Sequence, residues 1–235
     1  MISDSEGLED QALRVGRKIA NAFGLLFALV LLTYALASLT KFAGWGAVGL
    51  SVVASMSSCV GFAAADAPPK VVRWAALLAL VSIVLEAISA AGASHSLLGI
   101  GALIQMLLLS AAALTVLVAV MLETKVGFRT ILGAISVFVM LSLLFAFLYV
   151  GIDRLQGGAF FAGDPKLGTG DYIFFSLTTL TTTGYGNLVP AAQPGKMFAG
   201  IEMLTGQIFV VTLIAGLVSM WQPGEWARAR RQRKR

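Results

Sequence analysis

The chain has 235 residues, of which 58% are hydrophobic and only 12% are charged, and its mean hydropathy is +0.87. This charged fraction is about half that of a typical soluble domain, so the composition excludes an ordinary soluble protein and indicates a membrane protein. The formal net charge is +5, and the single cysteine, Cys59, excludes an intrachain disulfide.

Six segments are apolar and long enough to cross a bilayer, which takes about 20 residues of helix. We expect these spans at residues 20–39, 45–64, 71–90, 97–122, 130–152 and 197–221. The opening residues are acidic and the first apolar run has the length of a full span, so we expect no cleavable signal peptide. The predicted fold class is therefore an all-α membrane protein with six transmembrane helices.

The distribution of basic residues predicts the orientation of the chain. An even number of spans places both termini on one side, and 13 of the 17 Lys and Arg residues fall on that side. Only Lys41, Arg154, Lys166 and Lys196 fall on the other. Because cytoplasmic loops carry an excess of Lys and Arg, we expect a multi-pass protein of the cell membrane with both termini in the cytoplasm.

Ahead of the first span, apolar residues recur with helical spacing at Leu8, Ala12, Val15 and Ile19. This pattern predicts a cytoplasmic amphipathic segment over residues 1–19 that lies at the inner membrane surface. A polar tail that simply precedes the first span fits the same residues equally well.

Residues 20–122 are expected to form a front module of four helices. The second span is rich in small residues such as Gly49, Ser51, Ala54 and Gly61, which let helix backbones approach closely, so this helix should pack inside the protein. In the third span, Glu86 has no basic partner on the fourth. We expect it either to be protonated or to pair with Gln105.

The fourth span, 97–122, contains no Arg or Lys. Electrical work in a membrane scales with the charge moved, at about 2.3 kcal/mol per elementary charge per 100 mV. A helix without charge cannot extract that work, so the sequence predicts at most weak voltage dependence.

The stretch from Thr179 to Pro190 has the pattern of neither a helix nor a strand. In it, Gly184 and Gly186 flank Tyr185 after a run of threonines. Glycine tolerates backbone conformations that strain other residues, and alternating it with other residues suits a segment whose carbonyls all point one way. Such carbonyls, repeated around an axis, can replace the water shell of a potassium ion. Irregular backbone at membrane depth must lie inside protein or beside water, so this segment should line a pore.

The sequence Thr182-Thr183-Gly184-Tyr185-Gly186 resembles the selectivity filter of potassium channels, usually T-V-G-Y-G. The preceding residues 171–180 resemble the pore helix of that family, and Leu188-Val189-Pro190 resembles its post-filter turn. The resemblance implies a pore domain over residues 123–221, comprising an outer helix, a turret, a re-entrant pore helix, the filter and an inner helix. Because one chain supplies one of the four filter loops that the family uses, it also implies a homotetramer.

In the family, backbone carbonyls of the filter and the hydroxyl of its first threonine hold the permeant ions. The resemblance therefore implies K⁺ as the only metal ion, without any cofactor, and gives as its ligands Thr182, Thr183, Gly184, Tyr185 and Gly186. Tyr185 should point away from the axis and pack on the pore helix. The residues expected to support the filter are Phe174, Phe175, Thr178, Asn187 and Glu202.

Three positions depart from the family pattern. Thr183 replaces a valine or isoleucine, Asn187 replaces an aspartate, and Thr178 stands where some bacterial channels carry a glutamate that bonds to that aspartate. An acid pair behind the filter is therefore not expected. Selectivity for potassium should survive, because the row of carbonyls is intact. The three departures can alter the conductance and the slow inactivation.

The last span continues the resemblance. Gly206 falls at the position of the inner-helix hinge glycine, with close packing against the pore helix as the alternative role. The residues then expected to face the cavity are Gln207, Val210, Ile214 and Val218. Glu202, in the outer half of this span, should lie behind the filter, where a hydrogen bond to the pore helix is its simplest role.

The segment 222–235 is predicted to be a basic cytoplasmic tail. Its basic residues are Arg228, Arg230, Arg231, Arg233, Lys234 and Arg235. Beside a membrane span such a cluster attracts anionic lipid by about 1 kcal/mol per residue, although it can also serve only to retain the topology. We expect no nucleic-acid partner, because nothing else in the sequence predicts a soluble module for reading nucleic acid.

The function predicted from the sequence is a potassium-selective ion channel that conducts passively through a tetrameric pore and is weakly voltage-gated or not voltage-gated. A less selective monovalent cation channel is one alternative. The membrane subunit of a transporter is another, and it would predict paired, repeated broken helices. An enzyme is not expected, since the sequence contains no metal cluster, nucleophile constellation or phosphate loop.

Overall fold

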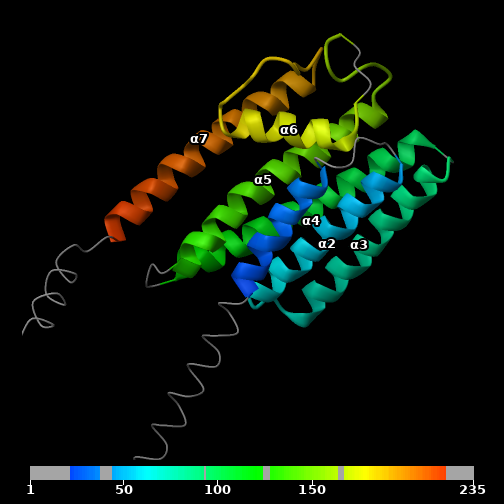
Figure 1. Ribbon diagram of the computed structural model, residues 1–235. Helices are drawn as coiled ribbons and strands as arrows, with labels where there is room; N and C mark the ends of the chain where they lie inside the picture. The colour runs from blue at the N-terminus through cyan, green and yellow to red at the C-terminus, as the bar shows by residue number, and fades with distance from the viewer. Residues whose placement is uncertain (1–21, 38–43, 93, 124–127, 164–166, 221–235) are drawn as a thin grey trace, which may run out of the picture.

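The computed structural model describes residues 22–37, 44–92, 94–123, 128–163 and 167–220, without the side chains of residues 128, 129, 214 and 217–220. These ranges contain helices and no β-strand (Figure 1). The helices are Ala22–Ala37, α2 (Trp45–Ala64), α3 (Pro69–Ala90), α4 (His95–Leu122), α5 (Phe128–Leu155), α6 (Thr169–Leu180) and α7 (Gly195–Met220). All but Ala22–Ala37 and α6 are long and apolar enough to cross a membrane. The predicted all-helical fold is confirmed for the described residues, and its five long apolar helices agree with a membrane protein. The ends of the expected first span lie outside the described residues.

The helix Ala22–Ala37 forms one bundle with α2, α3 and α4, and α5 packs along α4, the most extensive contact among α2 to α7 (Figure 1). The short α6 lies at one end of α5, against α7. Toward its other end α7 diverges from α5, and the gap is a hollow of about 650 Å³ lined mainly by apolar side chains such as Leu117, Leu141 and Phe209. The bundle therefore supports α5 and α6, while α7 stands free along much of its length.

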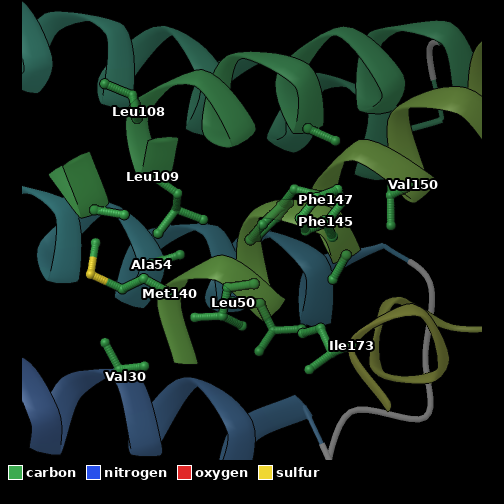
Figure 2. Close-up of a cluster of buried hydrophobic side chains, with 14 of the residues drawn as sticks. Val30, Leu50, Ala54, Leu108, Leu109, Met140, Phe145, Phe147, Val150 and Ile173 are labelled. Atoms are coloured by element: carbon green, nitrogen blue, oxygen red, sulfur yellow. The ribbon is translucent and has the colours of Figure 1, made fainter. Parts of the chain in front are cut away.

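One continuous core joins the bundle to α6. Figure 2 shows buried side chains from five helices, among them Val30, Leu50, Leu109, Met140 and Ile173. Each of these five is at most 2% exposed. Because close-packed interiors resist displacement, this core fixes the position of α6 relative to the bundle.

The small residues of α2 let it pack inside the protein, as predicted. In its most apolar stretch 56% of residues are buried, compared with 22% in α3. At Gly61 a Cβ would lie 3.4 Å from Cγ2 of Val116, so α2 and α4 approach closely there.

Local signals in the sequence account for where several helices begin. Pro69 opens α3, a position at which its missing N–H costs nothing. Ser94 caps α4 by accepting the N–H of Ser96 at 3.2 Å. The carboxylate of Asp171, in the first turn of α6, accepts the N–H of Gly168 at 2.9 Å.

Several predicted features lie outside the described residues. These are the amphipathic segment over 1–19 and the basic tail over 222–235.

A glycine in α4 offers a test of this packing. A Cβ at Gly101 would lie 2.8 Å from Cγ of Glu86 and 3.1 Å from the carbonyl oxygen of Ser82, so α3 and α4 would have to separate. We expect Gly101→Ala to lower the stability by about 1–3 kcal/mol, as overpacking does, measured as a lower Tm in detergent. Gly49→Ala is the matched control, because nothing lies within 4 Å of its Cβ position. Equal Tm values for the two variants would contradict the packing described.

Candidate functional site

The segment that follows α6 is anchored to that helix through its backbone N–H groups. The N–H of Thr182 donates to the carbonyl of Thr179 at 3.0 Å. The N–H groups of Thr183 and Gly184 both donate to the carbonyl of Thr178, at 2.8 and 3.1 Å. The last carbonyls of a helix lack partners within the helix. Those of α6 therefore accept the N–H groups of the segment and hold it in place.

Every second residue of this segment has left-handed backbone. The φ angles are 57° at Thr182, 50° at Gly184 and 79° at Gly186, whereas Thr183 and Tyr185 are not in that region. In a regular strand successive carbonyls point to opposite sides, and inverting the backbone at every second residue turns them toward the same side. At Thr182, which has a Cβ, this conformation costs about 1–2 kcal/mol. Strain of this kind concentrates at functional sites.

The carbonyl oxygens of the segment are left free. In the described part of the chain, none of the carbonyls from Thr181 to Leu188 accepts a hydrogen bond. Residues 181–187 are all exposed in the single protomer. A row of backbone oxygens without protein partners is a set of hard oxygen ligands, the kind that alkali cations bind.

Two threonine hydroxyls brace the start of the segment. The hydroxyl of Thr181 donates to the carbonyl of Leu177 at 2.7 Å, so the hydroxyl of Thr183 donates to Oγ1 of Thr181 at 2.9 Å. The buried hydroxyl of Thr178 donates to the carbonyl of Phe175 at 3.0 Å and thus stays on α6. Asn187 is exposed, and no hydrogen bond joins it to Thr178 in the described structure.

The two phenylalanines of α6 lie on different faces. Phe174 stacks on Tyr185, with ring centroids 5.8 Å apart. Phe175 is buried on the other side, against the rings of Tyr149 and Phe161 at 5.2 and 5.0 Å. The ring that supports Tyr185 within the protomer is therefore that of Phe174.

The end of the segment is tied to the loop that follows α5. The N–H of Ala162 donates to the carbonyl of Val189, and the N–H of Ala191 donates to the carbonyl of Phe160, at 2.9 and 2.8 Å. These bonds hold the chain on both sides of Pro190, so the segment is fixed at both ends.

A chain of polar side chains lies buried behind α6. Oε2 of Glu202, on α7, accepts a hydrogen bond from the hydroxyl of Tyr149 at 2.6 Å, and its Oε1 contacts the hydroxyl of Ser176 on α6. The Ser176 hydroxyl also lies 2.6 Å from the carbonyl oxygen of Ser142 on α5. Oγ of Ser142 in turn accepts from the hydroxyl of Tyr34, in the helix Ala22–Ala37. The chain joins four helices, and all its members except Tyr34 are fully buried.

On α7, the glycine predicted at a hinge packs tightly. A Cβ at Gly206 would collide with the carbonyl oxygen of Leu180, the last residue of α6. Gln207 and Val210 are exposed, whereas the side chains of Ile214 and Val218 lie outside the described part. The contact with Leu180 corresponds to the close-packing alternative for Gly206.

A second buried polar cluster lies in the bundle. Oε2 of Glu86 accepts from the hydroxyl of Ser51 at 2.5 Å, and Oε1 of Gln105 accepts from Ser55 and Ser82 at 3.0 and 3.2 Å. Oε1 of Glu86 and Nε2 of Gln105 have no partner among the described residues. The two side chains share one cluster, but no hydrogen bond pairs them as one of our alternatives expected.

No sequence pattern singled out Tyr34, Ser142, Tyr149 or Ser176 as site residues. The sequence signal that could have identified these residues is that each is a polar side chain within a mostly apolar helix. Ser142 and Tyr149 are seven residues apart, which is two helical turns, so they share a face of α5.

The contact between Gly206 and Leu180 yields a second test. Because the added methyl group would meet backbone, which cannot move aside as a side chain can, we expect Gly206→Ala to separate α7 from α6 and to lower the Tm of the purified protein by several degrees. The control is Gly200→Ala on the same helix, where nothing lies within 4 Å. Should Gly206→Ala be as stable as the control, the close approach of the two helices is not required.

Comparisons with known proteins agree with this site. Residues 116–222 match the family model described as an ion channel. The chain is 35% identical over 79 residues to two pore potassium channel c of Oryza sativa subsp. japonica, an alignment that covers 32% of this chain and 17% of that protein. It is 32% identical over 50 residues to voltage-gated delayed rectifier potassium channel KCNH5 of Homo sapiens, covering 21% of this chain and 5% of that protein. No solved structure matches the chain significantly.

The chain thus spans less than a fifth of the length of these curated relatives. The matched region includes α5, α6, the segment after α6 and α7, which are the elements that build the site. Residues 116–222 are therefore similar to ion channels, and the two relatives named above are potassium channels.

Proposed function

We propose that this protein is a potassium-selective channel of the cell membrane, in which four copies of the chain surround one pore and Thr182–Gly186 forms the filter. The observation that carries the proposal is the backbone of this segment. The N–H groups of its first three residues are bound to α6, and φ is positive at every second residue, namely Thr182, Gly184 and Gly186. Its carbonyls accept no hydrogen bond in the described structure.

Four such segments around an axis would present rings of oxygens to a dehydrated ion. Conduction then requires several sites of moderate affinity, with repulsion between ions moving them down their electrochemical gradient. In this arrangement α6 is the pore helix, and its C-terminal end carries a partial negative charge that favours a cation. The hydroxyl of Thr182 would contribute at the inner mouth.

Exposure in the single protomer supports assembly. The filter segment is exposed, and so is an apolar face of α7 that includes Ile201, Leu204 and Ile208. Only 17% of the apolar stretch of α7 is buried, compared with 61% in α5. The exposed face of α3 lies at the periphery of the bundle, whereas α7 packs against α6 beside the filter, where neighbouring copies would cover it.

The proposal includes a pore that is weakly voltage-gated or not voltage-gated. Helix α4 spans His95–Leu122 without an Arg or Lys. It packs along α5 of its own chain, so we propose that each front module, residues 20–122, sits beside its own pore domain, residues 123–221. The full topology would have six spans, with both termini in the cytoplasm and the tail over 222–235 on anionic lipid.

A less selective cation channel is the second candidate, and two residues favour it. Thr183 places a hydroxyl beside Thr181, and Asn187 supplies no negative charge at the outer end. Reversal potentials in mixed sodium and potassium separate the two candidates, because only a selective pore follows the potassium gradient.

The filter proposal is tested by flux. In liposomes that contain the purified full chain, we expect potassium-selective flux that Gly184→Ala lowers by roughly tenfold or more, because an L-residue at positive φ costs about 1–2 kcal/mol. Gly157→Ala is the matched control, since Gly157 lies in a loop with nothing within 4 Å and has no positive φ. Equal flux for both variants, or none for the wild type, would exclude the proposed filter.

The assembly is tested by the oligomeric state. We expect Ile208→Trp, on the exposed face of α7, to reduce the fraction of tetramer in native mass spectrometry, because a bulky ring would obstruct the contact between copies. Leu78→Trp on α3 is the control, as this side chain is also exposed but lies away from the filter. The assembly is wrong if the wild type is not tetrameric or if both variants dissociate equally.

A further inference from the structure

The polar chain behind α6 allows its hydrogen atoms to be counted. A hydroxyl group carries one hydrogen, and a backbone carbonyl can only accept. Oγ of Ser142 lies 3.3 Å from Oγ of Ser176 and, as a hydroxyl, can donate to it. The oxygen of Ser176 lies 2.6 Å from the carbonyl oxygen of Ser142 and also contacts Oε1 of Glu202. Its single hydrogen cannot serve both contacts.

The short distance to the carbonyl oxygen of Ser142 decides where the hydrogen of the Ser176 hydroxyl points. If the hydrogen of Ser176 pointed to Glu202, two lone-pair oxygens would face each other at 2.6 Å with no hydrogen between them. The Ser176 hydroxyl therefore donates to Ser142, and the hydrogen toward Glu202 must belong to the carboxyl group. Oε2 of Glu202 already accepts from Tyr149, so the acid proton lies on Oε1.

We infer that Glu202 is a neutral carboxylic acid, and that its proton positions α7 against α6 behind the filter. The acid then donates to Ser176 through Oε1 and accepts from Tyr149 through Oε2. Every polar atom of the carboxyl group is satisfied, as burial at 0% exposure requires. The role of this proton in conduction rests on the proposed function, whereas its presence does not.

The surroundings supply nothing else that could neutralise a carboxylate. In the described structure, the polar contacts of Glu202 are Tyr149 and Ser176. The titratable or charged groups on the described parts of the helices packed around it are Tyr34, Tyr149, Asp153, Arg154, Asp171, Tyr172 and Lys196. Arg154 pairs with Asp153 at 3.4 Å, and Lys196 is exposed at the start of α7. A proton is therefore the cation that this site takes up.

Loss of the proton would remove a donor and leave a buried charge without a counter-ion, which is costly. The hydrogen bond between Glu202 and Ser176 would become a repulsion between the carboxylate and the serine oxygen. The alternative is that the Ser176 hydroxyl turns toward the carboxylate and breaks its hydrogen bond with the carbonyl of Ser142. In either case α6 loses one of its buried ties, and the filter that it anchors would shift. Flux should therefore fall as the pH is raised through the titration of Glu202.

Glutamine is the discriminating replacement. In Glu202→Gln, the amide NH₂ can donate to Ser176 while its oxygen accepts from Tyr149, so the pattern of the protonated acid is kept without a titratable group. Glu202→Ala removes both bonds and leaves Ser176 and Tyr149 unsatisfied. A glutamine that mimics the wild type is expected only if the glutamate is neutral.

The test uses the purified full chain in liposomes and combines an infrared spectrum with potassium flux. We expect the wild type minus Glu202→Gln difference spectrum at neutral pH to show the carbonyl stretch of a protonated carboxyl group. Flux should be within about twofold for Glu202→Gln and lower by roughly tenfold for Glu202→Ala. The fall of flux at alkaline pH should be present in the wild type and absent in Glu202→Gln. Glu123→Gln, which removes an exposed carboxylate at the end of α4, should retain both the band and the fall.

A difference spectrum without the protonated band would overturn the inference, and so would a Glu202→Gln protein as impaired as Glu202→Ala. If the wild type carried no potassium flux, the channel proposal would fail, but the infrared band would still decide whether Glu202 holds a proton. The Tm provides a further readout, because Glu202→Gln should unfold near the wild-type temperature and Glu202→Ala below it.

Discussion

The proposed channel depends on one constraint, which is that the carbonyl edge of residues 182–186 must stay free of protein partners. The segment can then be held only through its N–H groups, its side chains and its ends. The carbonyl of Thr178 binds two of those N–H groups, and Phe174 stacks on Tyr185. Both of these anchors belong to α6, so the position of α6 largely determines the position of the oxygens.

The bundle formed by the helix Ala22–Ala37 and α2 to α4 can influence the proposed filter, because it helps to fix the position of α6. Without basic residues on α4 it offers little for a membrane field to move, but its core continues through α5 to Ile173 of α6. Tyr34 adds a polar tie, because its hydroxyl binds Ser142, the residue whose carbonyl lies beside Ser176. A bundle of this kind would brace the proposed filter by packing and hydrogen bonding. It need not respond to voltage in order to matter to the pore.

The spans were largely predictable because a bilayer imposes length and composition on each helix. The bounds expected for α2 coincide with those observed, and the other long helices begin only two residues earlier than expected. The left-handed backbone of the proposed filter was partly predictable, because this conformation favours glycine, which stands at two of its three positions. The third, Thr182, could not be foreseen, since a threonine at positive φ is held there by its surroundings rather than by its own preference.

What the sequence could not supply was the pairing of residues across helices. Tyr149 and Glu202 are 53 residues apart, and their hydrogen bond depends on how α5, α6 and α7 meet. The resemblance placed an acid pair beside the filter in related channels and showed that Thr178 and Asn187 cannot form it. The structure has instead a single acid on α7 that reaches α6 from behind. One proton between Glu202 and Ser176 can hold α6 without placing any charge near the proposed ion path, and therefore without competing with the free carbonyls for a cation.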